Sequence, residues 1–97
     1  MKNLKQIQSI LSKHKEELNR KYNVREIGVF GSYVRGEQKK ASDVDILVEF
    51  EKPIGFFKFL EMEEHIGSIL GMKVDLVTKN SLKPRIGKHI LKEVVAI

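Results

Sequence analysis

Two short stretches decide the fold of this 97-residue chain: Gly-Ser-Tyr-Val-Arg-Gly at residues 31–36 and Ser-Asp-Val-Asp-Ile-Leu-Val at residues 42–48. The first begins with a glycine directly after an apolar run, which is typical of a tight turn from a strand into a helix. The second places two aspartates at the start of a run rich in valine and isoleucine, which is typical of a strand. A strand, a turn with a short helix and a second strand are therefore expected between residues 25 and 50.

Helical and strand periodicities continue on both sides of this centre. Apolar residues recur at helical spacing in residues 3–22 and 56–70, and residues 72–78 alternate as a strand does. Residues 84–92 predict a short helix, and residues 94–97 predict a strand or an apolar tail. The whole pattern predicts a small α/β (α+β) fold, in which a mixed sheet is flanked by helices. The aromatic residues of the second long helix, Phe56, Phe57 and Phe59, are expected in the core and a partner interface.

Length and composition narrow the function classes. The length of 97 residues predicts one domain, residues 1–97. The sequence contains neither an apolar run long enough to cross a bilayer nor an N-terminal signal core, so a cytoplasmic protein is expected, without a membrane partner. Cysteine is absent, which excludes thiolate nucleophiles and cysteine-bound zinc. The net charge of +5 is spread along the chain, which disfavours nucleic acid and suits a nucleotide or an acidic protein partner.

Asp43 and Asp45 are the first candidate site residues. They stand two residues apart at the start of a predicted strand, so both side chains are expected on one face, with Val44 turned into the core. Two neighbouring carboxylates repel each other unless a cation neutralises them. Magnesium prefers carboxylate oxygens together with the phosphates of a substrate. The pair therefore predicts a magnesium site that also binds a phosphorylated ligand.

Asp75 is the third candidate carboxylate. It lies in a predicted strand whose other face carries Val74 and Leu76, so it is expected to point away from the apolar side. A neighbouring strand would then place it beside Asp45. Carboxylates in this arrangement could hold two magnesium ions that serve both oxygens of an in-line displacement at phosphorus.

The glycine turn supplies candidate phosphate-binding groups. Gly31 lets the main chain approach a phosphate closely, and the amides that follow, with the Ser32 hydroxyl, are suitable hydrogen-bond donors. Arg35 adds a positive charge beside them, although an ion pair with Glu37 is an alternative role for it.

The spacing of Gly31-Ser32 and Asp43-Val44-Asp45, with ten residues between them, resembles the signature of polymerase-beta-like nucleotidyltransferases. The longer pattern resembles the minimal nucleotidyltransferase family, the MntA-like antitoxins that are paired with HEPN-domain toxins. Further matches are residues 71–77, 82–85 and 90–93, so the resemblance covers nearly the entire chain.

The resemblance implies a role for each candidate residue. Gly31 and Ser32 would hold the triphosphate of ATP, Asp43 and Asp45 would bind Mg²⁺, and Asp75 would act as a further ligand or as the base for the attacking hydroxyl. It also implies transfer of AMP from ATP to a tyrosine of a HEPN-domain toxin. Two alternatives remain open at this point: an antitoxin that acts by steric contact alone, and a transferase whose acceptor is RNA or a small molecule.

Overall fold

The computed structural model describes residues 2–97, and Met1 lies outside the described residues. Its elements confirm the predicted order of helices and strands and the predicted fold class, and the C-terminal apolar tail forms a short strand. In chain order they are α1 (Leu4–Tyr22), β1 (Val24–Phe30), α2 (Ser32–Arg35), β2 (Val44–Phe50), α3 (Phe56–Leu70), β3 (Val74–Thr78), the 3-10 helix η1 (Lys79–Ser81), α4 (Pro84–Glu93) and β4 (Val95–Ala96).

Local chemistry sets the ends of α1. The Asn3 side chain accepts a hydrogen bond from the Gln6 main-chain N–H, and the Gln6 side chain accepts one from the Asn3 N–H. This reciprocal pair satisfies two donors at the helix start. At the other end, Asn23 adopts a left-handed conformation with φ of 58°, which turns the chain directly into β1. Within residues 2–97, no helix combines the length and apolarity that a bilayer crossing requires.

The four strands form one mixed sheet in the order β3-β2-β1-β4. Strand β1 is antiparallel to both β2 and β4, whereas β2 and β3 are parallel. In this register Asp45 of β2 lies between Phe30 of β1 and Asp75 of β3. The sheet therefore brings the end of β1, the start of β2 and the start of β3 to one place.

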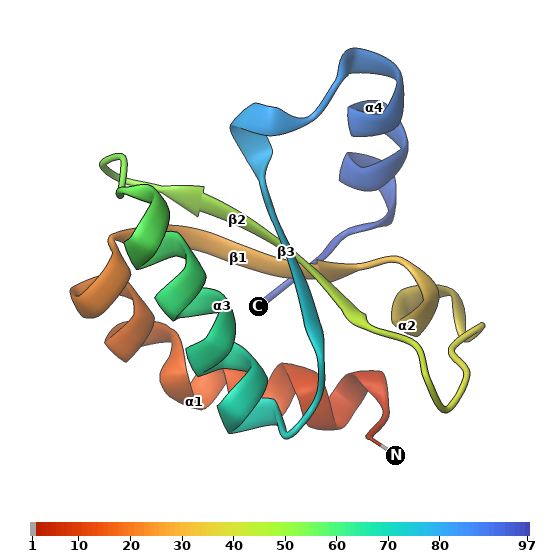
Figure 1. The fold of residues 1–97 in the computed structure, drawn as a ribbon. Helices are drawn as coiled ribbons and strands as arrows, with labels where there is room; N and C mark the ends of the chain where they lie inside the picture. The colour runs from red at the N-terminus through yellow and green to blue at the C-terminus, as the bar shows by residue number, and fades with distance from the viewer. Residues whose placement is uncertain (1) are drawn as a thin grey trace.

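Helices α1 and α3 pack on the same face of the sheet and cover the core (Figure 1). Alternate residues of each strand point toward these helices, as strand geometry requires. The core prediction for α3 is wrong for Phe56 and Phe57, which are 70% and 85% exposed, whereas Phe59 packs against the core. The partner interface stays a prediction. The fully buried side chains of the core include Ile7, Leu11, Leu18, Val29, Val44, Ile46, Val48, Met62, Ile66 and Leu70.

The opposite face of the sheet carries the other set of strand residues. Asp45, Leu47 and Glu49 alternate with the buried residues of β2 and point to this face. Helix α4 lies on this side of the sheet, away from α1 and α3 (Figure 1). Asp45 and Asp75 thus lie on the sheet face that α1 and α3 leave uncovered.

Replacing Ile46 by alanine tests the core directly behind Asp45. Ile46 is fully buried, so its truncation leaves a cavity and we expect the free energy of unfolding to fall by about 2–5 kcal/mol. Chemical denaturation followed by circular dichroism measures this loss. The control is Ile86→Ala on α4, whose side chain is 57% exposed and whose truncation should cost less than about 0.5 kcal/mol. Equal losses in the two variants would contradict the assignment of the core.

Candidate active site

The turn at Gly31 forms one wall of the site. Gly31 has φ of 81° and ψ of −152°, a region of backbone conformation that is essentially restricted to glycine. A Cβ atom at this position would lie 2.0 Å from Oδ2 of Asp45, so a side chain is also excluded by space. The glycine therefore allows the Asp45 carboxylate to lie directly against the main chain at the end of β1.

Asp75 stands beside Asp45 on the neighbouring strand. The two residues are paired in the parallel register of β2 and β3. Val74 and Leu76 are buried in the core while Asp75 is exposed, which confirms that Asp75 points away from the apolar side. One carboxylate is thus partly enclosed and its neighbour is open to solvent.

Asp43 takes a different position from the predicted one. Strand β2 begins at Val44, so Asp43 belongs to the preceding loop. It lines a cavity of about 690 Å³ together with Lys40 and Lys73, whereas Asp45 lines another of about 590 Å³. Val44 is fully buried as predicted, but the two aspartates do not simply share one strand face. The two aspartates line different cavities, although the charge of Asp43 still raises the pKa of Asp45.

The electrostatics of Asp45 reflect its crowded surroundings. Burial raises the pKa of Asp45 above its ordinary value of 3.8, and the negative charges of Asp75 and Asp43 raise it further. Arg35 acts in the opposite direction, and Glu93 adds to the increase. The ionised form of Asp45 is therefore under-compensated, which is the condition in which a bound cation stabilises a site.

The donor set suits magnesium, but the carboxylates are not gathered into a finished metal site. Among the described residues, no three histidine, aspartate or glutamate side chains are placed to hold an ion together. Magnesium needs few protein ligands, because it retains water and binds substrate phosphates. The charge surplus around Asp45 fits such an ion, and the predicted set of ligands remains a prediction.

Arg35 and Ser32 lie where the glycine turn leads into α2. Ser32 is the first residue of this helix and is half-buried, and its carbonyl accepts a hydrogen bond from the Glu37 N–H. The Arg35 guanidinium donates to the carboxylates of Glu37 and Glu93 at 2.5 Å each. The alternative role of Arg35 as a partner of Glu37 is therefore present in the structure.

Glu93 is the residue of this site that sequence analysis missed. It lies at the end of α4, and its second carboxylate oxygen accepts a hydrogen bond of 2.8 Å from the Gly31 main-chain N–H. Burial raises the pKa of Glu93, but the Gly31 and Arg35 hydrogen bonds outweigh it and hold the pKa below the ordinary value of 4.5. No local sequence pattern predicts this contact, because it joins residues that are 62 positions apart.

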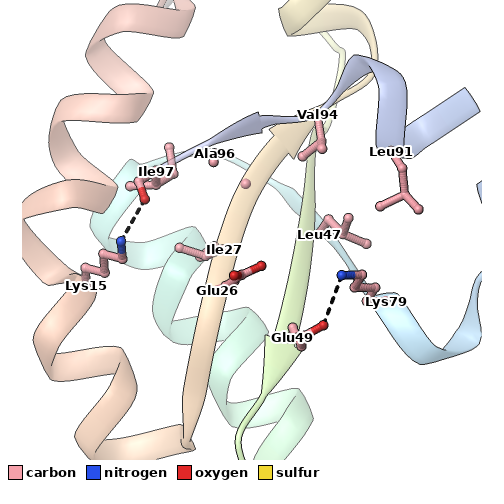
Figure 2. Close-up of a pocket in the computed structure, with 11 residues that line it drawn as sticks. Lys15, Glu26, Ile27, Leu47, Glu49, Lys79, Leu91, Val94, Ala96 and Ile97 are labelled. Carbon is pink, nitrogen blue, oxygen red and sulfur yellow. Dashed lines mark hydrogen bonds and ion pairs between the residues drawn. The ribbon is translucent and has the colours of Figure 1, made fainter.

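A second cleft lies along the same face of the sheet, between β1, β2, β4 and α4 (Figure 2). Its volume is about 300 Å³, and Leu47, Leu91 and Val94 contribute apolar walls. Ion pairing at its rim joins Lys79 to Glu49 at 3.1 Å. None of the predicted site residues lines this cleft, so the candidate site is the neighbouring cavity that Asp45, Gly31 and Arg35 share.

Replacing Asp45 by asparagine tests the charge surplus through pH dependence. Because the folded-state pKa of Asp45 is raised, its ionised carboxylate destabilises the fold at pH values above that pKa. We therefore expect the metal-free Asp45→Asn variant to be more stable than the unmodified protein at pH 7. The difference should shrink as the pH falls through the pKa of Asp45, because the carboxylate then becomes neutral.

Thermal unfolding at a series of pH values in the presence of a chelator measures this difference. The matched control is Glu26→Gln at the far end of the same sheet face, where the side chain is exposed. A less stable Asp45→Asn variant at pH 7 would contradict the electrostatic account of the site.

Known proteins share both the sequence and the fold. The family model of the nucleotidyltransferase domain matches residues 11–97. The protein adenylyltransferase MntA of Thermococcus cleftensis is 57% identical over 97 residues, with 100% of this chain and 98% of the relative covered.

Solved structures agree with these sequence relatives. One that is named as a minimal nucleotidyltransferase superposes with a TM-score of 0.84 at 27% identity, over 99% of this chain and 97% of that chain. A toxin–antitoxin structure with AMP-PNP superposes with a TM-score of 0.73 at 26% identity, over 88% of this chain and 69% of that chain. The chain therefore belongs to the nucleotidyltransferase domain family, as one of its minimal, MntA-like members.

Proposed function

We propose that this protein transfers AMP from ATP to a hydroxyl group of a partner protein, in a reaction that depends on Mg²⁺. The observation that carries the proposal is the position of Asp45, which has the Gly31 turn on one side and Asp75 on the other. Hydrogen-bond donors for a triphosphate and carboxylates for the reacting centre therefore lie on neighbouring strands, at the same end of the sheet. The 57% identity to a protein adenylyltransferase supports the same reaction.

We propose different roles for the residues on the two sides of Asp45. On the β1 side, the Gly31 amide, Ser32 and Arg35 would hold the triphosphate, because amides and guanidinium groups donate to phosphate oxygens. Asp43 and Asp45 would hold Mg²⁺ ions, and Asp75 would act as the base for the acceptor hydroxyl. When bound, magnesium would neutralise the negative charges of the carboxylates and of the triphosphate.

The exposed side of the site would receive the acceptor. The acceptor hydroxyl oxygen forms a bond to the α-phosphorus of ATP, the bond from that phosphorus to the bridging oxygen breaks, and pyrophosphate leaves. The hydroxyl proton passes to a carboxylate. Asp75 suits this role because it is exposed and stands beside Asp45, on the side of β2 away from the Gly31 turn.

A HEPN-domain toxin is the partner that we propose, with a tyrosine as the acceptor. One solved complex with this fold is described as a tri-AMPylated HEPN toxin of Shewanella oneidensis with its MNT antitoxin, and another as MntA–HepT. These chains are 22% and 21% identical to this one, so their likeness concerns the fold. The net charge of +5 of this protein suits an acidic partner surface.

Intact-mass spectrometry of the partner tests the proposal. We expect the partner to gain one or more AMP units after incubation with this protein, Mg²⁺ and ATP, and to gain nothing with the other nucleoside triphosphates. The Asp43→Ala/Asp45→Ala double variant should abolish the gain, because it removes the proposed magnesium ligands. Chelation of the metal should have the same effect on the unmodified protein.

The matched control is a Glu26→Ala/Glu51→Ala double variant, which changes the net charge equally at two exposed positions away from the site. It should retain full transfer. If no triphosphate modifies the partner while the two proteins still form a stable complex, the protein acts by contact, and the transferase proposal is wrong.

Replacing Asp75 by asparagine tests its role at the acceptor hydroxyl. A general base contributes about 10²–10⁴-fold to a rate, so we expect the transfer rate to fall by roughly this factor. Complex formation with the partner should be unchanged, because the substitution retains the size of the side chain. Single-turnover transfer and calorimetric partner binding provide the two measurements. A rate within about twofold of the unmodified protein would exclude Asp75 as the base.

A further inference from the structure

Glu93 joins three separate parts of the candidate site. One of its carboxylate oxygens accepts from the Gly31 main-chain N–H at 2.8 Å, and the other accepts from Arg35 at 2.5 Å. The Glu93 side chain is 19% exposed and Arg35 is 50% exposed, so the contact with Gly31 is more sheltered from water than the contact with Arg35. A single side chain of α4 therefore accepts one hydrogen bond from the end of β1 and one from α2.

These two donors are the ones that a phosphate group would use. A carboxylate and a phosphate both accept from main-chain amides and from the guanidinium group in similar geometry. Glu93, Gly31 and Arg35 line the same cavity of about 590 Å³ as Asp45. A triphosphate next to Asp45 and the Glu93 carboxylate would thus compete for the same hydrogen bonds.

Charge strengthens the competition. Glu93 adds to the rise in the pKa of Asp45, which shows that the two carboxylates repel each other. A triphosphate would bring further negative charge into the same cavity, so its binding and the present position of Glu93 oppose each other. The hydrogen bonds also favour the ionised form of Glu93, so this carboxylate carries a full charge at neutral pH.

The position of Glu93 on its helix points to the same conclusion. Glu93 is the last residue of α4, where the helix dipole disfavours a negative charge. Its contacts with Gly31 and Arg35 therefore compensate for an unfavourable place on the helix. Strand β4 begins at Val95 and pairs with Gly28 and Val29 of β1, so the chain that follows Glu93 is held against the sheet independently of the Glu93 side chain.

We propose that Glu93 is an internal substitute for a phosphate group, which holds Gly31 and Arg35 in the nucleotide-free protein and is displaced by the triphosphate of the nucleotide. The inference rests on the proposed function, because it places the triphosphate on these donors. Glu93 is then a positioning residue. It keeps the donors arranged before the nucleotide arrives, and it lowers the affinity for the nucleotide because its contacts must first be broken.

Titration calorimetry with Mg-ATP and with inorganic triphosphate tests the displacement. We expect Glu93→Gln and Glu93→Ala to bind both ligands about tenfold more tightly than the unmodified protein. The gain from Glu93→Ala should be smaller in an Arg35→Ala background, because only the competition for the Gly31 amide and the charge repulsion then remain. In transfer assays, Glu93→Gln should lower KM for ATP without raising kcat, a split that loss of structure alone would not produce.

The control is Glu37→Gln, which removes the other ion-pair partner of Arg35 without touching the Gly31 amide. It should change ATP binding by less than about twofold. A folded Glu93→Gln variant with unchanged or weaker affinity would overturn the displacement, as would an equal gain in Glu37→Gln. Absence of Mg-ATP binding in the unmodified protein and in both Glu93 variants would instead overturn the proposed function, and the role of Glu93 with it.

Discussion

The close approach of the Gly31 main chain to the Asp45 carboxylate is the contact on which the rest of the site depends. It brings the end of β1 against the start of β2, where Phe30 and Asp45 are paired. A Cβ atom at residue 31 would overlap Oδ2 of Asp45, so the arrangement requires glycine. The same turn starts α2 and brings Arg35 into the site. One unusual backbone conformation thus sets the positions of a carboxylate, an amide donor and a guanidinium.

The site concentrates negative charge in a protein whose net charge is +5. Burial raises the pKa of Asp45, the negative charges of Asp75, Asp43 and Glu93 raise it further, and Arg35 acts in the opposite direction. Such an arrangement costs stability in the free protein, because the carboxylates repel one another. In the proposed reaction, a divalent cation bound together with substrate phosphates would supply the missing compensation. The same carboxylate charges therefore destabilise the free site and would attract the cation in the proposed reaction.

The C-terminal segment completes the site from the far end of the chain. Strand β4 pairs with β1, and a Cβ atom at Gly28 would lie only 2.6 Å from Cγ2 of Val94. The absence of a side chain at Gly28 therefore lets the end of α4 lie close over the sheet. From this position Glu93 reaches Gly31 and Arg35. The packing of a short strand thereby links the last helix to the groups that we propose for nucleotide binding.

The order of the elements could be predicted from the sequence, because helices and strands leave local periodicities in it. Helical and strand periods predicted the order of elements, and the alternation around Asp75 predicted its direction away from the core. Only the tertiary structure decided that Asp43 lies in a loop beside a different cavity, and that Phe56 and Phe57 are exposed. It also decided the contacts of Glu93 with residues 58 and 62 positions away. Periodicity reports which face of an element is apolar, whereas contacts between distant residues depend on how the elements pack, and that packing is a property of the whole chain.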